Sequence, residues 1–133
     1  MLYPMFFMVI LTFIIGVITL AVRVNSVRSG QVKIKYYRAM QGQEVPDIVN
    51  RTSRCFSNMF EIPVLFYVAA SLFLSLNIHS QTAIICAWLF VAFRCLQALV
   101  HLTYNNVLHR MLMFWGCVIA MLVMWVTLLV KAG

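Results

Sequence analysis

The sequence predicts an all-α membrane protein, a bundle of four transmembrane helices that forms a single domain over residues 1–133. Hydrophobic residues make up 64% of the chain and charged residues 10%, whereas soluble domains are about 45–50% apolar and about 25% charged. The apolar residues gather in four runs, and each approaches the roughly 20 residues that a helix needs to cross a bilayer. Little of the chain is left for a separate soluble domain.

The first apolar run contains no charged residue. Tyr3 and Pro4 suit its entry at one membrane interface, and Arg23 marks its other end. Beyond Arg23, valines are interleaved with polar residues, so we expect this helix to continue past the lipid.

The other three runs are joined by short polar connections at residues 77–82 and 103–110. Short connections make consecutive helices antiparallel neighbours. Before the second run, Asp47 follows a proline and is expected to cap a helix that continues through Arg51 and Arg54 into the membrane. The four predicted spans are Tyr3–Val22, Phe56–Leu76, Ala83–Leu102 and Met111–Val130.

The net charge of +7 is concentrated in one part of the chain. Seven of the ten Lys and Arg residues lie between Arg23 and Arg54, so membrane topology and anionic lipid headgroups explain them better than a nucleic-acid partner. The positive-inside rule predicts that segments 23–54 and 103–110 are cytoplasmic and that both termini are outside. The run Lys33–Arg38 is either an interfacial patch or a contact for an anionic ligand.

The cysteines give no sign of a metal site. None of the four has CxxC or another ligand spacing, and three lie inside apolar runs. We interpret them as thiols packed within helices.

Two ionisable residues, Glu61 and Arg94, lie within predicted spans, where a charge is costly and by default indicates a functional site. Glu61 lies early in the second span, and Arg94 lies about two turns before the same-side end of the third. Antiparallel neighbouring helices bring them to similar depth, so we predict a Glu61–Arg94 ion pair. Breaking it would leave a buried charge, at a cost of roughly 3–5 kcal/mol.

Further polar residues lie on the same helix faces as Glu61 and Arg94. These two faces are expected to converge near Arg110, at the start of the fourth span. The two faces consist of Arg54, Asn58 and Glu61, and of Arg94, Gln97 and His101. One interpretation is a buried network that fixes helix register. The surplus of arginines over Glu61 favours a cytoplasm-facing pocket for an anionic ligand, because guanidinium groups bind carboxylates and phosphates bidentately.

Three segments carry a further pattern. The first is Arg54-x-x-x-Asn58-x-x-Glu61-x-Pro63, followed by a long apolar span. The second is residues 30–35, and the third runs from Arg94 through a short connection to Arg110, which opens the fourth helix. Together they resemble the MAPEG family (membrane-associated proteins in eicosanoid and glutathione metabolism). The chain resembles a bacterial-type member of that family. The likeness covers essentially the whole chain.

The resemblance implies a homotrimer in a bacterial inner membrane, with cytoplasm-facing sites between subunits. In catalytic members glutathione binds there as co-substrate and reacts with lipophilic small molecules. Carried over by position, Arg110 would be the catalytic cation that stabilises the glutathione thiolate, Lys33 would meet a carboxylate, and Glu61 would lie near the amino group or pair with Arg94. The residues implied to bind glutathione, or an anionic lipid, are Lys33, Arg54, Asn58, Glu61, Arg94 and His101.

The chain also departs from the catalytic members of that family. Residues 56–57 are Phe-Ser in place of a His-Arg pair, and Met111 replaces a small hydroxyl residue. His101 and Gln97 stand where the third helix has a tyrosine and a histidine, and Phe114 replaces a tyrosine. His101 is therefore either a substitute hydrogen-bond donor or a residue that satisfies the bundle.

Three functions follow from these observations. The first is glutathione transfer or glutathione-dependent peroxide reduction on apolar electrophiles. The second is non-catalytic binding of a lipid or fatty acid on the same scaffold, which the altered contacts favour. The third, proton-coupled export, is disfavoured because the first span contains no carboxylate.

Overall fold

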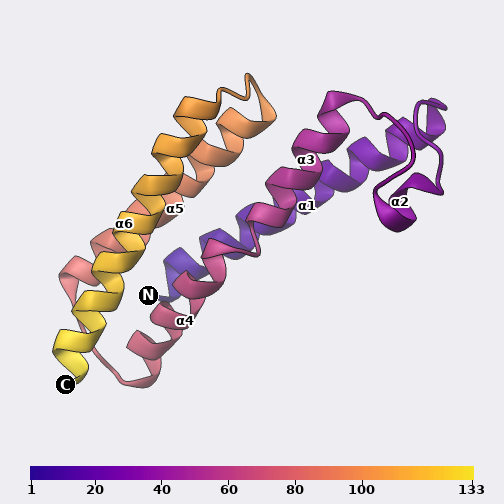
Figure 1. Cartoon of the computed structure of the whole chain (residues 1–133). Coiled ribbons are helices and arrows are strands. Elements are labelled where there is room, and N and C mark those ends of the chain that lie inside the picture. Colours follow the sequence, from indigo (N-terminus) through magenta and orange to yellow (C-terminus); the bar gives the residue numbers. More distant parts are fainter.

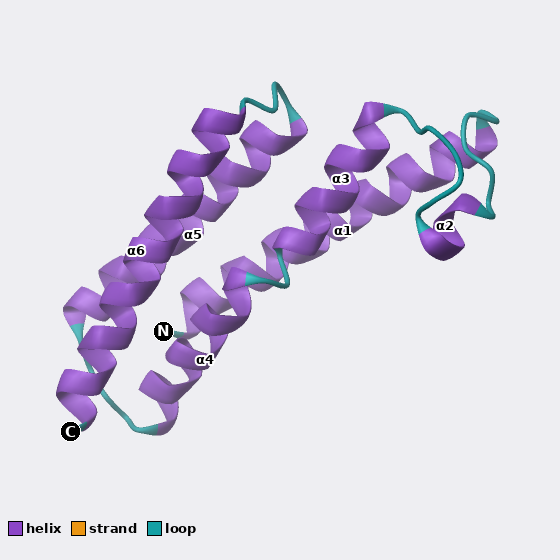
Figure 2. Ribbon diagram, viewed as in Figure 1, coloured by secondary structure: helices purple, strands orange, loops and turns teal.

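A computed structural model describes all residues 1–133 as helices and connections, without a β-strand (Figure 2). The helices are α1 (Leu2–Arg28), α2 (Tyr36–Ala39), α3 (Asp47–Asn58), α4 (Ile62–Ser75), α5 (Gln81–Leu102) and α6 (Val107–Ala132). Four segments are long and apolar enough to cross a membrane: α1, α3 together with α4, α5, and α6. The predicted class, an all-α membrane protein with four spans, is confirmed.

The helices form two groups (Figure 1). α5 and α6 make an antiparallel hairpin, and α1 runs along α3 and α4. Both termini and the α4–α5 connection lie toward one end of the bundle, while the connections that follow α1 and α5 lie toward the opposite end. We call this opposite end the basic end, because it carries the residues of the cationic segment 23–54.

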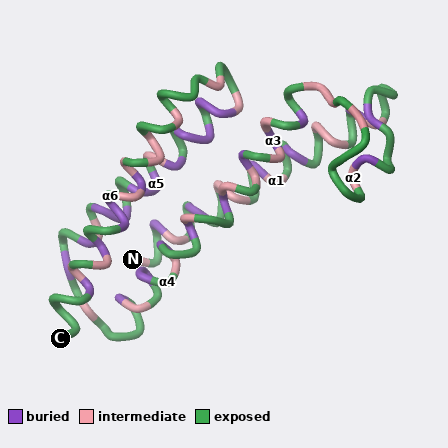
Figure 3. Tube along the Cα trace, in the orientation of Figure 1, coloured by how far each residue is buried: buried purple, intermediate pink, exposed green.

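The core lies where α4, α5 and α6 meet. Phe66 of α4 stacks on Phe90 of α5 with the ring centroids 4.5 Å apart. Large side chains alternate with alanines along these helices, so the backbones approach closely. The outer surface is largely exposed in the single chain (Figure 3) and is rich in apolar side chains, as expected for helices that face lipid or other copies of the chain.

Helix ends follow local capping chemistry. α1 continues past Val22 to Arg28, as predicted. α6 begins at Val107, ahead of the predicted Met111, because the Asn106 side chain accepts hydrogen bonds from the backbone N–H groups of the first turn. Asp47 does begin α3, but its side chain forms an ion pair with Arg51 and caps no backbone group.

The second span is interrupted, which corrects the expected unbroken helix. α3 ends at Asn58, and α4 begins at Ile62. Pro63 explains the interruption: in a continuous helix its ring would clash with the carbonyl of Met59, and it has no N–H to donate there. The helix therefore stops before Glu61 and resumes with the proline in the first turn of α4, where it is tolerated.

Gly116 fixes the close approach of α6 to α5. A Cβ atom at this position would lie 2.9 Å from the Phe93 ring. Gly116→Val is therefore expected to force the two helices apart and to lower the free energy of unfolding by about 1–3 kcal/mol. Thermal unfolding of the purified protein in detergent measures this effect.

The exposed position Ala92 on α5 provides the matched control, since Ala92→Val adds bulk without a facing neighbour. Trimming the ring by Phe93→Ala in the Gly116→Val background should recover part of the lost stability. No recovery would mean that the Gly116–Phe93 contact is not the cause.

Candidate functional site

The polar residues of α5 lie on one buried face, as their spacing predicts. Arg94, Gln97 and His101 are 1%, 6% and 2% exposed, respectively. Because α5 packs against α3 and α6, this face points into the interior of the bundle. A charged side chain in that setting needs acceptors or a ligand to compensate for its lost hydration.

Arg94 has fewer partners than its guanidinium group can use. Nη1 donates to Oε1 of Gln97 at 2.8 Å and makes a long contact of 3.5 Å to the backbone oxygen of Asn58. The guanidinium carbon lies 5.6 Å from the centre of the Phe90 ring, which adds a cation–π contact. Nε and Nη2 are buried and have no hydrogen-bond partner. Two donors in the interior are thus left for an acceptor that the single chain does not supply.

The predicted Glu61–Arg94 ion pair does not form within the chain, since the single ion pair joins Asp47 to Arg51. The break at residues 59–61 is the cause. It ends α3 before Glu61, which becomes the residue preceding α4 and is exposed. A neutral amide, Gln97, takes the position beside Arg94 that the prediction gave to a carboxylate.

A cavity of about 250 Å³ lies next to this group, between the end of α3, the middle of α5 and the start of α6. We call it the polar cavity, and its lining residues are Asn58, Gln97, Val107, Arg110, Met111 and Phe114. Arg94 lies directly behind the lining, because it contacts Asn58 and Gln97. The structure therefore brings Asn58, Arg94 and Arg110 together, as the sequence predicted.

Arg110 is held by the α5–α6 connection. Its Nη1 donates to Oδ1 of Asn105 at 2.9 Å, while its Nε is buried without a partner. Asn105 has the left-handed backbone conformation (φ 51°), which asparagine tolerates better than most residues. The tight connection thus aims one side of the guanidinium group at Asn105 and leaves the other for the cavity.

The remaining predicted site residues do not line the polar cavity. Arg54 is exposed on α3, and His101 is buried on α5 without a hydrogen bond. Lys33 is exposed in the connection after α1, where its backbone N–H donates to Gln43. Any contact that Lys33 makes with this cavity would have to come from another copy of the chain.

Sequence reasoning missed the roles of two residues that organise the site. Gln97 was placed on the polar face of Arg94, but it was not identified as the side-chain acceptor for Arg94. Its spacing of three residues from Arg94 on one helix was the available signal. Asn105 orients Arg110 from a connection, and no periodic pattern reveals such a contact.

The electrostatic character of the site follows from this inventory. Arg110 lines the cavity with one unpaired Nε, Arg94 adds a positive charge from behind the lining, and no carboxylate lines the cavity. Such a site suits an anion, because charge-assisted hydrogen bonds to guanidinium groups are among the stronger ones. Apolar side chains at the start of α6, such as Phe114, border the same space.

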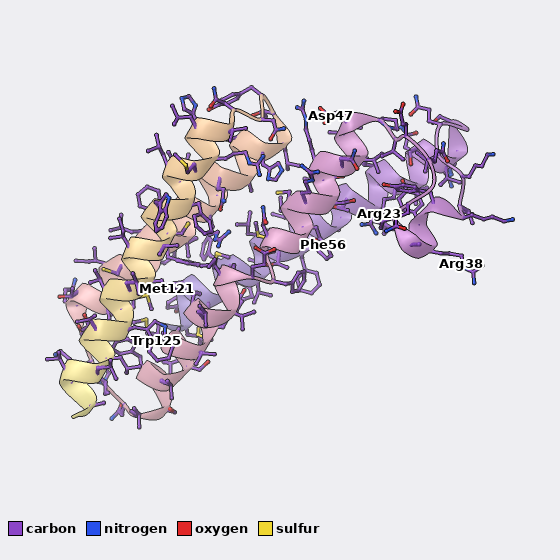
Figure 4. The ribbon with its side chains drawn as sticks, in the orientation of Figure 1. Arg23, Arg38, Asp47, Phe56, Met121 and Trp125 are labelled. Atoms are coloured by element: carbon purple, nitrogen blue, oxygen red, sulfur yellow. The ribbon has the colours of Figure 1, made fainter.

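A second, larger depression lies on the α1 side of the broken span. We call it the apolar groove; it measures about 530 Å³ and is lined almost entirely by apolar side chains from α1, α3 and α4, with Thr12 and Tyr67 as its polar residues. Phe56, labelled in Figure 4, lies at its wall, close to Gly16 of α1. Of residues 56 and 57, only Phe56 lines the groove, and it adds an apolar side chain to this surface.

Gln97 should contribute to stability through Arg94. Gln97→Leu removes the short hydrogen bond of Arg94 Nη1 and leaves this buried nitrogen with only its long contact to Asn58, so we expect a loss of about 1.5–3 kcal/mol in the free energy of unfolding. Gln97→Glu keeps the acceptor and supplies a countercharge, so it should be at least as stable as the parent. Thermal unfolding in detergent compares them, with Gln81→Leu at the exposed start of α5 as control. Equal melting of the Leu and Glu variants would contradict this role.

Comparison with known proteins agrees with this architecture. The model of the MAPEG family matches residues 1–130 of the 133-residue chain. Neither the curated proteins nor the solved structures give a match. The family match extends over all four spans and over the residues of the polar cavity. The chain therefore belongs to the MAPEG family.

Proposed function

We propose that this MAPEG-family membrane protein binds glutathione in the polar cavity and conjugates it through its sulfur to lipophilic electrophiles, with Arg110 stabilising the thiolate. The observation that carries the proposal is the buried, unpaired Nε of Arg110 in the lining of a cavity with no acidic lining residue. Arg94 lies behind that lining and adds a second positive charge. Glutathione has two carboxylates and one ammonium group at neutral pH, so it brings the net negative charge that this cavity lacks.

The transfer reaction requires above all that the site lower the pKa of the glutathione thiol. A free thiol has a pKa of about 8.5, and a cation close to the sulfur lowers it by favouring the charged form. Arg110 lines the cavity and has an unpaired Nε. The thiol proton would leave to solvent, and the thiolate would attack an electrophilic carbon, forming a carbon–sulfur bond as the leaving group departs. A thiolate is also the species that reduces a hydroperoxide.

We further propose that the functional unit is a homotrimer with the sites between subunits. At about 250 Å³ the polar cavity is smaller than the roughly 300–1,000 Å³ of typical small-molecule sites, which suggests that one chain supplies part of the site. Glu61 and Lys33 are both exposed in the single chain. A neighbouring copy would bury Glu61 and bring a carboxylate to the amino group of glutathione, and Lys33 to one of its carboxylates.

The basic end gives the expected orientation. Seven of the ten Lys and Arg residues belong to segment 23–54, so by the positive-inside rule we expect this end to be cytoplasmic and both termini to be outside, in a bacterial inner membrane. The polar cavity opens near the start of α6, toward the same end, where a water-soluble thiol is available. Lipophilic electrophiles would reach it from the bilayer.

The apolar groove favours a second candidate function, non-catalytic binding of a fatty acid or lipid. It is larger than the polar cavity and presents almost no polar lining. A protein that lacks affinity for glutathione but retains a fatty acid through purification would support this function and exclude the transferase.

Arg110 should control thiolate formation. Titrating the purified protein with glutathione should raise the ultraviolet absorbance of the thiolate at neutral pH, and Arg110→Ala should abolish that signal and reduce conjugation of a lipophilic electrophile by at least about tenfold. The expected size corresponds to a thiol pKa shift of roughly one unit. Stopped-flow absorbance and a conjugation assay measure the two effects.

The control for Arg110→Ala is Arg38→Ala, which removes an exposed arginine from the connection after α1. Arg38→Ala should leave thiolate formation unchanged. Thiolate absorbance that persists in Arg110→Ala, or is absent from the parent protein, would contradict the proposal.

The trimer predicts a definite mass. Native mass spectrometry in mild detergent should report three times the chain mass of 15.3 kDa. Reversing the exposed charge by Glu61→Arg should weaken this assembly, because the surplus of cations at the subunit boundary would then lack its carboxylate. A monomeric parent protein would contradict the proposal that subunits share the site. A trimer that is unchanged by Glu61→Arg would show that Glu61 does not lie at the interface.

A further inference from the structure

A separate pocket lies at the basic end of α1. It measures about 370 Å³ and is lined by Arg23, Val24, Val27, Arg28, Ile34 and Tyr37. We call it the α1 pocket. It shares no lining residue with the polar cavity or with the apolar groove. Figure 4 shows Arg23 beside the folded connection that follows α1, far along the molecule from Met121 and Trp125 in α6.

The pocket is formed by a chain segment that folds back on α1. Gly30 has φ 72°, a conformation that favours glycine and turns the chain at the helix end. The returning segment is then tied to Ser26 twice. The backbone N–H of Val32 donates to the Ser26 carbonyl at 3.1 Å, and the hydroxyls of Tyr37 and Ser26 lie 2.7 Å apart. Val32 is 2% exposed, so this wall of the pocket is fixed by packing as well as by hydrogen bonds.

Two arginines give the pocket its charge. Arg23 donates through Nη2 to Oγ of Ser53 at 3.1 Å, and its guanidinium carbon lies 5.5 Å from the centre of the Tyr37 ring. Its Nε is buried and has no partner. Arg28 is exposed and makes neither a hydrogen bond nor an ion pair through its side chain. No acidic residue lines the pocket, so two guanidinium groups share it without a countercharge.

Three of the other four lining residues, Val24, Val27 and Ile34, are aliphatic. Val24 and Ile34 are 42% and 71% exposed, which is unfavourable for side chains surrounded only by water. α1 has 27 residues and is therefore about 40 Å long at about 1.5 Å per residue, which exceeds the roughly 30 Å hydrocarbon core. Its last two turns, which carry the pocket, therefore emerge at the level of lipid headgroups.

We propose that the α1 pocket binds one anionic phospholipid of the surrounding leaflet. The phosphate lies between Arg23 and Arg28, and the upper part of an acyl chain covers Val24, Val27 and Ile34. A free phosphate would satisfy the arginines but leave this apolar wall exposed, and a zwitterionic headgroup would add a cation to a pocket that already has two. The site is independent of any ligand in the polar cavity.

Arg28 is the residue to test, because it lines the pocket without supporting the fold. Delipidated protein in a non-ionic detergent is titrated with phosphatidylglycerol or phosphatidylcholine of identical acyl chains, and bound lipid is counted by native mass spectrometry. Each basic residue near a membrane surface contributes about a fivefold gain in affinity for anionic lipid. The parent protein should therefore prefer phosphatidylglycerol by more than about tenfold, and Arg28→Gln should lower that preference about fivefold.

Arg38→Gln is the matched control, because it removes the same charge from another exposed arginine of the basic end, in α2 and outside the pocket. It should leave the lipid preference intact, and free glycerol phosphate at equal concentration should fail to displace the bound lipid. The proposal is overturned if the parent protein shows no preference, if both variants lose it equally, or if glycerol phosphate competes fully. It is also overturned if Arg28→Gln changes the oligomeric mass instead, since another copy of the chain would then occupy the pocket.

Discussion

The buried guanidinium group of Arg94 constrains the whole bundle. It lies inside a membrane protein at 1% exposure, with one side-chain acceptor on its own helix and a long contact to the last residue of α3. A group of this kind stabilises an arrangement only when its donors are used. The polar cavity lies between α3, α5 and α6 beside Arg94, and the proposed anion site rests on this arrangement.

The interrupted second span decides how charge is distributed around this centre. An unbroken helix would have carried Glu61 inward on the same face as Asn58, and the carboxylate would have neutralised Arg94. The proline break instead puts Glu61 on the outside of the chain and leaves Gln97 beside Arg94. The interior keeps its excess of cations, and the exterior gains a carboxylate that is costly to leave in an apolar environment. Ligand binding and self-association would relieve these two imbalances.

The two ends of the bundle differ in how far their cationic side chains have hydrogen-bond partners. Toward the termini, the cation of Lys131 is satisfied by a backbone oxygen of the α4–α5 connection at His79. At the basic end, Arg110 and Arg23 each have a buried nitrogen without a partner, in two pockets that share no residue. One pocket lies between α3, α5 and α6, and its proposed ligand is a small soluble anion. The other lies at the end of α1, and its proposed ligand is an anionic lipid.

Composition and periodicity were enough to predict four spans, their antiparallel order, and the common buried face of Arg94, Gln97 and His101, because burial in lipid imposes a strong and local pattern on each helix. Pro63 was also a signal for the break. Helical spacing alone nevertheless placed Glu61 on the same continuous helix face as Arg54 and Asn58. The contact of Asn105 with Arg110 and the folded wall of the α1 pocket depend on the geometry of connections. The absence of the Glu61–Arg94 pair depends on the break before α4 and on how α3, α4 and α5 pack. Such contacts leave no periodic trace, since they arise from packing and connection geometry rather than from the order of residues along one helix.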